Sequence, residues 1–265
     1  MTNIPFFQVD AFAERPLTGN PAAVMPLERW LADDVLQAIA AENNLSETAF
    51  TIPSENKKAD FDLRWFTPTV EVDLCGHATL AAGHILLTGD TVRFSTRAGI
   101  LEVAKSGGHL ELDLPAAALE EVEEPDLFSA LGLKGQTAWL ATSCNDAAII
   151  LLADEAAVRD VAPDFAALSA IQRMAVVTAP GDTQDVASRV FVPYCGIDED
   201  PVTGSAHAAL TPFWAKRLGR NRFSALQASK RTGLLDCRLE GDRVVLGGKC
   251  VTVIVGHFQL ADGVR

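Results

Sequence analysis

The stretch Cys75-Gly-His-Ala-Thr-Leu-Ala81 recurs in altered form as Thr203-Gly-Ser-Ala-His-Ala-Ala-Leu210. In each copy a glycine and other small residues open a nearly uncharged run, which predicts an apolar helix entered through a tight turn. A helix that is apolar all round is buried, so in a strand-rich half it most simply lies inside a curled sheet. The repeat therefore predicts an α+β fold of two similar, pseudo-twofold related domains with the active-site cleft between them.

Strand and helix patterns surround both of these stretches. Phe61–Phe66 alternates between the two faces of a predicted strand, and a helix is predicted from Asp33 or Asp34 to about Asn43. Further strands are predicted at 6–12, 22–25, 45–52, 91–95, 100–105, 109–114, 138–141, 147–152, 174–178, 188–192, 225–229, 234–239, 243–247 and 249–255, and further helices at 78–87, 155–160, 164–170 and from the second repeat to about 218.

A domain boundary is predicted near the middle of the chain. The acidic stretch Pro115–Pro125 is the candidate linker. It separates an N-terminal domain, residues 1–115, from a C-terminal domain, residues 125–256. The C-terminal end of the chain is a candidate to complete the first domain.

Composition indicates a cytoplasmic globular protein. The 265 residues suit two domains, and the net charge of −13 with scattered basic residues argues against nucleic-acid binding. Five widely spaced cysteines without a Cys-x-x-Cys pair fit a reducing compartment. The sequence shows no signal peptide and no apolar run long enough to cross a membrane, so we expect no membrane partner. A monomer and a homodimer both fit this composition.

Motifs typical of cofactor and metal enzymes are missing. The sequence has no G-x-S-x-G, no H-E-x-x-H, no G-x-x-x-x-G-K-[ST] and no G-x-G-x-x-G after a strand. Hydrolase, zinc-protease, nucleotide and dinucleotide functions therefore lack support. We expect neither a cofactor nor a metal site.

The two helix entrances are candidate sites for a substrate carboxylate. A helix N-terminus carries unpaired N–H groups and about half a positive charge, and glycine lets a ligand approach the backbone. Gly76 with His77, and Gly204 with Ser205, are placed to bind an anion in this way. The alternative is that both glycines only permit tight turns into packed helices.

Two carboxylates are candidates for the chemistry itself. Glu47 lies in the mostly apolar stretch Leu45–Phe50, and a desolvated carboxyl group suits a general acid/base near neutral pH. A solvated strand position is the alternative for Glu47. Asp200 precedes Pro201, so it either caps the second helix or faces the cleft and orients a substrate amine or hydroxyl.

Two further side chains stand at the first helix entrance. His77 is placed to donate to a carboxylate or to assist proton transfer. Cys75 is either a nucleophile or base, because a helix N-terminus lowers a thiol pKa, or a buried small hydrophobe. His207, just inside the second helix, is a candidate supporting residue.

Five ordered blocks resemble the phenazine-biosynthesis PhzF-like isomerase family of the diaminopimelate-epimerase-like superfamily. They are Val9-Asp-Ala-Phe12 with Gly19-Asn-Pro21, Leu45-Ser-Glu-Thr-Ala-Phe50, Arg64-Trp-Phe-Thr-Pro68, Glu71-Val-Asp-Leu-Cys-Gly-His-Ala-Thr-Leu80 and Asp198-Glu-Asp-Pro-Val-Thr-Gly-Ser-Ala206. The resemblance spans about residues 5–256. It implies two similar domains, each a curled, mostly antiparallel sheet around a central apolar helix.

The resemblance also implies a cofactor-free isomerase. In the family's characterised member a glutamate shuttles a proton between two carbons of a cyclic amino acid, dihydro-hydroxyanthranilate, and Glu47 takes that glutamate's place. His77 and Asp200 match polar residues of the family's cleft. The matches to substrate-binding residues of the family and of related epimerases are Asn20, Gly76, Gly204 and Ser205.

One position departs from the related epimerases. Amino-acid epimerases of this fold use two cysteines as opposed bases, one at each helix entrance. Cys75 occupies the first place here, but Thr203 occupies the second, which argues against a two-thiol racemase. We therefore expect an isomerase in which Glu47 moves a proton between carbons of a small, unsaturated, amino acid-like carboxylate. An epimerase that uses Cys75 and a catalytically silent binding protein are the alternatives.

Overall fold

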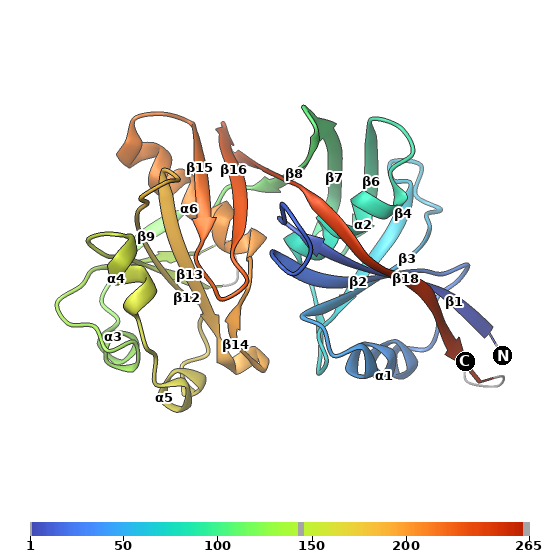
Figure 1. The fold of residues 1–265 in the computed structure, drawn as a ribbon, viewed down its shortest axis with the longest axis horizontal. Coiled ribbons are helices and arrows are strands. Elements are labelled where there is room, and N and C mark those ends of the chain that lie inside the picture. Colours follow the sequence, from blue (N-terminus) through green and yellow to red (C-terminus); the bar gives the residue numbers. More distant parts are fainter. Residues whose placement is uncertain (1, 143–145, 262–265) are drawn as a thin grey trace. The chain divides into compact units, whose positions relative to one another are not determined.

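The chain forms two compact units in the computed structural model, which describes residues 2–142 and 146–261 (Figure 1). Unit 1 consists of Met1–Asp113 and Gly247–Arg265, and unit 2 consists of Leu114–Leu246. Within the described residues, no helix is both long and apolar enough to cross a bilayer.

The last strand of the chain belongs to unit 1. The sequence leaves two assignments for the C-terminal end, a second domain that runs to residue 256 or a segment that completes the first domain. The structure places the residues from Gly247 onward with the first unit. The physical reason is β18 (Cys250–Leu260), which pairs antiparallel with β1 (Thr2–Ala11) along the whole of β1. Backbone hydrogen bonds along both strands thus tie the C-terminal segment to the N-terminal one.

Unit 1 is built around a mostly antiparallel sheet (Figure 1). Its other strands are β2 (Asn20–Pro26), β3 (Glu47–Pro53), β4 (Phe61–Phe66), β5 (Glu71–Val72), β6 (Thr91–Thr96), β7 (Gly99–Ser106) and β8 (His109–Pro115), which runs into unit 2. The pairs β2–β3 and β4–β6 are parallel, and the pairs β1–β2, β3–β4, β4–β5, β6–β7 and β7–β8 are antiparallel. A parallel pair needs a crossover connection, which α1 (Asp33–Asn43) and α2 (Gly76–Leu86) supply.

The two helices of unit 1 pack on opposite faces of its sheet. Apolar residues of α1 pack with Met25, Phe50 and Phe66 on one face. On the other face α2 packs against β1, β2, β3, β7 and β18, and its residues 76–83 are buried. Gly83 permits this close approach, because a β-carbon there would lie 2.6 Å from a methyl group of Val103. The central helix expected from the repeat is therefore α2.

Unit 2 repeats this arrangement with different outer helices (Figure 1). Its strands are β9 (Leu119–Val122), β10 (Ala138–Ala141), β11 (Ala147–Leu151), β12 (Ala175–Pro180), β13 (Val186–Val192), β14 (Ile197–Asp200), β15 (Arg222–Gln227), β16 (Gly233–Glu240) and β17 (Arg243–Gly248), and its helices are α3 (Pro125–Ala130), α4 (Glu155–Asp160), α5 (Phe165–Ala170), the 3-10 turn η1 (Pro193–Cys195) and α6 (Gly204–Leu218). The pairs β11–β12 and β13–β15 are parallel, as β2–β3 and β4–β6 are in unit 1.

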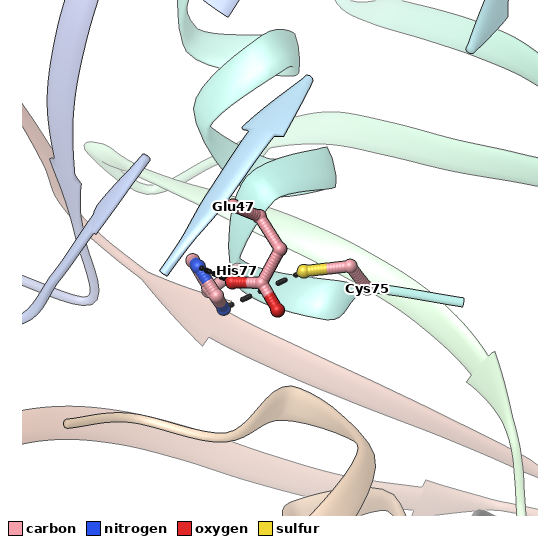
Figure 2. A group of neighbouring side chains, drawn as sticks. All are labelled: Glu47, Cys75 and His77. Carbon is pink, nitrogen blue, oxygen red and sulfur yellow. Dashed lines mark hydrogen bonds and ion pairs between the residues drawn. The ribbon is translucent and has the colours of Figure 1, made fainter. Parts of the chain in front are cut away.

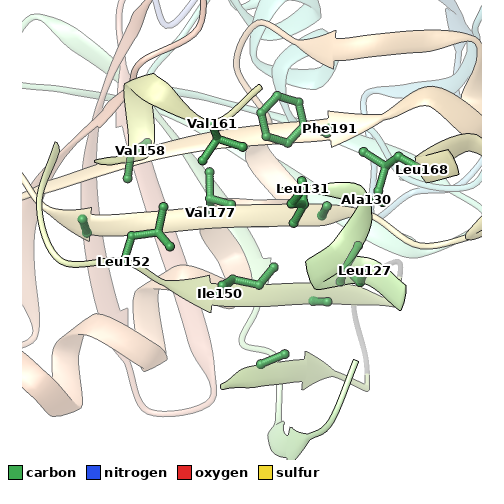
Figure 3. Packing of buried hydrophobic residues seen from close by; sticks show 14 residues of the cluster. Leu127, Ala130, Leu131, Ile150, Leu152, Val158, Val161, Leu168, Val177 and Phe191 are labelled. Carbon is green, nitrogen blue, oxygen red and sulfur yellow. The ribbon is translucent and has the colours of Figure 1, made fainter. Parts of the chain in front are cut away.

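The two faces of the unit 2 sheet carry separate cores. Figure 3 shows one face, where α3, α4 and α5 place Leu127, Val158 and Leu168 against Ile150 and Phe191 of the strands. Helix α6 packs against β11 and β16, and its Trp214 Nε1 donates a hydrogen bond to Thr178 Oγ1 at 3.0 Å. Nearly every residue from 204 to 215 in α6 is buried, as the uncharged sequence predicts. Each unit thus encloses one apolar helix, and the predicted epimerase-like α+β architecture is confirmed.

Two stretches of unit 2 differ from the sequence-based expectation. Pro115–Pro125 was the candidate linker, but it contains β9, which pairs with β10 from Leu119↔Ala141 to Val122↔Ala138. The run Asp198–Asp200, for which no strand is predicted, belongs to β14, which pairs antiparallel with β13. Both stretches contain exposed carboxylates and lack the alternation of apolar and polar residues that predicts a strand. They still form strands because strand pairing uses backbone groups and needs no apolar side chain.

Candidate active site

The sheet of unit 1 brings Asn20 and Glu47 to the face that carries α2. Ala22 of β2 pairs with Glu47 of β3, so their side chains point to the same face. Asn20 lies two residues before Ala22 on β2 and therefore shares that face. Phe50 lies three residues after Glu47 and points to the opposite face, into the core that this face forms with α1. Period-2 alternation thus aims Asn20 and Glu47 at the first turn of α2.

His77, the second residue of α2, is the centre of this cluster (Figure 2). Its Nε2 lies 2.9 Å from Glu47 Oε2. On the other side of the ring, His77 Nδ1 lies 3.2 Å from Asn20 Nδ2 and 3.6 Å from Cys75 Sγ. Only 4% of the His77 side chain is exposed, against 14% for Glu47. Glu47 is therefore the member of the pair that a substrate can reach.

The hydrogen-bond partners select the tautomer of the neutral imidazole. An amide nitrogen such as Asn20 Nδ2 only donates, so in the neutral ring His77 Nδ1 accepts and His77 Nε2 carries the hydrogen. Protonation of Nδ1 requires the Asn20 amide to present its oxygen to the ring instead. Burial works against a charge on this ring, but the negative charge of the Glu47 carboxylate beside it favours one, and the pKa of His77 lies well above its ordinary value. His77 is thus poised to hold an extra proton next to a carboxylate.

Cys75 is the N-cap residue of α2 and is buried. Burial, and then the charge of Glu47, raise the pKa of the Cys75 thiol. This burial fits the alternative of a small buried residue, and the catalytic role of Cys75 stays a prediction. Near neutral pH Cys75 is a neutral thiol beside His77, which makes it a poor base.

A titration of the histidine ring tests this description of the site. We expect the His77 ring to titrate above pH 6.5, its ordinary value, and Glu47→Gln to lower that midpoint because the neighbouring charge is removed. Since the folded-state pKa is the higher one, the resulting stabilisation is complete below pH 6.5 and is lost as the pH rises through the raised pKa. Carbon-13 NMR of the histidine rings measures the midpoint.

His84 provides the internal reference for that titration. Its Nε2 lies 3.0 Å from Thr252 Oγ1, and the partial burial of the ring lowers the pKa of His84 below the ordinary value. Wild-type spectra should therefore show His84 below pH 6.5 and His77 above it. An unchanged His77 midpoint in Glu47→Gln contradicts the assigned ion pair.

The trio Glu47, Cys75 and His77 also has the residue types of a metal site. One ligand atom from each lies within 4.8 Å of the others. In the structure, however, His77 contacts Glu47 through one ring nitrogen and Cys75 through the other. These contacts describe a proton-carrying cluster, and the sequence-based expectation of no metal site stays a prediction.

The other candidate residues lie in unit 2, at the junction of β14 and α6. Asp200 is the last residue of β14, is 8% exposed and accepts a hydrogen bond from Thr203 Oγ1 at 2.5 Å. Thr203 is the N-cap residue of α6, so Asp200 lies three residues before the helix cap and does not occupy the capping position. Gly204 and Ser205 form the first turn of α6 and are buried.

Two further residues of unit 2, which are not among the predicted site residues, contact the junction of β14 and α6. Gln227, at the end of β15, is completely buried and contacts both Asp200 and Thr203. His207 Nδ1 donates to the Thr203 carbonyl at 2.9 Å, and burial lowers the pKa of this ring to about 4. His207 is therefore neutral and holds the first turn of α6. A lone glutamine in a predicted strand carries no sequence signal, so Gln227 was not foreseeable.

The described site residues thus form two groups. Unit 1 brings together Asn20, Glu47, Cys75, Gly76 and His77, and unit 2 brings together Asp200, Gly204 and Ser205. The expectation that both groups serve one substrate stays a prediction. The described cysteines, which are Cys75, Cys195, Cys237 and Cys250, are free thiols, and Cys144 lies outside the described residues.

Comparisons with known proteins bear on the whole chain. A relative in Pseudomonas aeruginosa, described as an uncharacterized isomerase, is 47% identical over 97% of this chain and 99% of its own length. The crystal structure of a phenazine biosynthesis PhzF family protein from Enterococcus faecalis superposes with a TM-score of 0.90 at 43% identity, over 98% of this chain and 100% of that one.

More distant structures share the fold. A predicted epimerase from Pseudomonas aeruginosa superposes with a TM-score of 0.76 at 22% identity, over 97% of this chain and 100% of that one. The family model described as phenazine biosynthesis-like protein, PhzC-PhzF, matches residues 9–256. The chain therefore belongs to the phenazine biosynthesis-like PhzC-PhzF family.

Proposed function

We propose that this protein is an isomerase that moves a proton between carbons of a small, carboxylate-bearing, unsaturated metabolite, with Glu47 as the acid/base. The observation that carries the proposal is the 2.9 Å contact between Glu47 Oε2 and His77 Nε2, in which the glutamate is the more exposed partner. A group that removes and then returns a proton must touch the substrate and must be held in one place. Glu47 is held by its contact with His77, and we assign its exposed part to contact with the substrate.

The reaction begins with Glu47 ionised beside a substrate C–H bond that an adjacent unsaturation makes acidic. The carboxylate takes the proton, the electron pair moves into the unsaturated system, and Glu47 returns the proton to another carbon. His77 orients the carboxylate through Nε2 and stabilises its charge, and Asn20 fixes the ring through Nδ1. Glu47 ends the cycle as it began, so the scheme requires no cofactor.

The substrate carboxylate is assigned to the helix entrances. Neither α2 nor α6 has an acidic residue in its own first turn, and the N-terminus of a helix favours a bound anion. Gly76 in unit 1, and Gly204 with Ser205 in unit 2, are the proposed contacts. Asp200 is the proposed partner for a substrate amine or hydroxyl.

The experiment is deuterium incorporation from D₂O, followed by NMR. The enzyme is incubated with dihydro-hydroxyanthranilate and with a panel of unsaturated cyclic and acyclic amino acids. We expect wild-type enzyme to wash deuterium into a carbon position of at least one compound. No wash-in for any compound would contradict the proposed chemistry for these substrate classes and favour the binding-protein alternative.

Cys75→Ala separates the isomerase from an epimerase. We expect this variant to keep wash-in within about tenfold of wild type, because a buried neutral thiol is not the base in this scheme. The product should be a double-bond isomer. Loss of wash-in in Cys75→Ala together with inversion at one carbon would instead establish the epimerase that uses Cys75.

A further inference from the structure

We propose that Gln227 and Thr203 are positioning residues that form a one-directional hydrogen-bond chain ending on the Asp200 carboxylate. The inference rests on the proposed function for its catalytic meaning, since Asp200 is there the partner of a substrate polar group. All three residues lie in unit 2 and are nearly or completely buried, at 0%, 7% and 8% exposure for Gln227, Thr203 and Asp200. Nothing in their sequence motif points to Gln227.

The orientation of the Gln227 amide is fixed by the backbone. Its Oε1 accepts a hydrogen bond from the Thr203 backbone N–H at 2.8 Å. A backbone N–H only donates, so the oxygen of the amide must face Thr203 and the amide cannot turn over. Its Nε2 therefore donates, to the Asp200 carbonyl at 2.7 Å and to Thr203 Oγ1 at 3.3 Å.

That donation decides where the Thr203 hydroxyl points. A hydroxyl has one hydrogen, and the Thr203 oxygen already accepts one from Gln227. Its own hydrogen is left for Asp200 Oδ2, at 2.5 Å. Every link thus donates in the direction of the carboxylate. Hydrogen bonds that point one way polarise each other and favour the ionised acceptor, so the chain holds Asp200 charged and in a single orientation.

The surroundings of the chain fit this assignment. His207, in the first turn of α6, is neutral and is engaged by the Thr203 carbonyl and by Ser188 Oγ. Along β14, the side chains alternate, and Glu199 turns to a bidentate ion pair with Arg189. On β13, Asp200 faces Val190. Asp198 is exposed.

The hydrogen-bond chain also fixes the end of β14 relative to the start of α6. Gln227 is the last residue of β15. Its side chain donates to the backbone carbonyl of Asp200, the last residue of β14, and accepts from the backbone N–H of Thr203, the N-cap residue of α6. Ser229 Oγ adds a hydrogen bond to the Pro201 carbonyl at 2.8 Å. The loop from Asp200 to Thr203 is thereby fixed from one neighbouring strand, and the carboxylate is presented without a flexible connection.

The test is a titration of the Asp200 carboxyl carbon by carbon-13 NMR in the protein without ligand, with the signal assigned from Asp200→Asn. The matched pair is Thr203→Val, which removes the hydroxyl at nearly constant shape, and Thr203→Ser, which keeps it. We expect Thr203→Val to raise the Asp200 midpoint by roughly one pH unit or more, because a hydrogen bond to the charged form is lost. Thr203→Ser should stay close to wild type.

Gln227→Glu tests the upstream link with a side chain of the same size. The introduced carboxylate cannot donate to Thr203 Oγ1, so the hydroxyl turns toward it and away from Asp200. We expect the Asp200 midpoint to rise in Gln227→Glu as well. Equal midpoints in Thr203→Val and Thr203→Ser, or an unchanged midpoint in Gln227→Glu, overturn the proposal.

Two controls keep the outcome clear. Amide spectra of each variant establish that unit 2 is folded, so a shifted midpoint in Thr203→Val reports the hydroxyl and not a loss of structure. The titration needs no substrate, and the deuterium experiment needs no titration. If the titration gives the overturning result while deuterium incorporation is intact, the hydrogen-bond chain is rejected and the proposed isomerase stands. If the titration gives the expected result without deuterium incorporation, the isomerase is rejected and the hydrogen-bond chain stands.

Discussion

Glu47→Gln is expected to reduce deuterium wash-in by about 10³-fold, within the ~10²–10⁴ range that general acid–base catalysis contributes. The glutamine keeps the shape of the side chain, so its amide can occupy the same place, 2.9 Å from His77 Nε2. What the variant loses is the basic oxygen that takes the proton. The expected result is therefore a folded protein that binds substrate but does not exchange its hydrogen.

Glu42→Gln is the matched control for that variant. Glu42 lies near the end of α1 in the same unit and is exposed, so its loss changes the net charge equally without touching the cluster. We expect its wash-in rate to equal that of wild type. The proposed role of Glu47 is rejected if both variants exchange hydrogen at the wild-type rate.

Gly19→Ala is expected to destabilise unit 1 by on the order of 3 kcal/mol, combining left-handed backbone strain with a steric clash. Gly19 has φ of +67°, and an added β-carbon would lie 2.2 Å from the Ala11 carbonyl oxygen. The clash is with backbone, so β1 and β2 must move apart. Asn20 follows directly and lies 3.2 Å from His77 Nδ1, so wash-in should fall together with stability.

Chemical unfolding followed by circular dichroism measures the loss, with Gly89→Ala as the comparison. A β-carbon at Gly89 meets nothing within 4 Å, and its φ is not in the left-handed region. We expect that variant to lie within about 1 kcal/mol of wild type. Similar unfolding free energies for the two variants would show that the Gly19 turn is not strained by a side chain.

Elements with an internal pattern were predictable from the sequence. The alternation in Phe61–Phe66 coincides with β4, and the uncharged runs after Cys75 and Thr203 became the buried helices α2 and α6. The acidic strands β9 and β14 were not predictable, because their pairing uses backbone groups and leaves Glu120 and Asp198 exposed. Periodicity reports the burial of side chains, and these strands bury few.

The candidate site shows the same division. Glu47, His77 and Asp200 stood in motifs, so the sequence alone singled them out, although their shared role is still a prediction. The contact of Asn20 with His77 depends on the register Ala22↔Glu47, and the contact of Gln227 with Thr203 depends on β15 lying beside β13. Strand pairing between distant segments sets both contacts, and no local pattern encodes it.

The discontinuity of unit 1 has a consequence for folding during synthesis. β1 leaves the ribosome early, but its partner β18 follows only after all of unit 2, a delay of roughly 10–50 s at the usual rates of translation. Unit 2 is contiguous and can complete its sheet in that interval. The outer edge of β1 meanwhile remains open to pairing with another nascent chain. Unit 1, which carries Glu47 and His77, therefore cannot complete its sheet until the end of the chain has been synthesised.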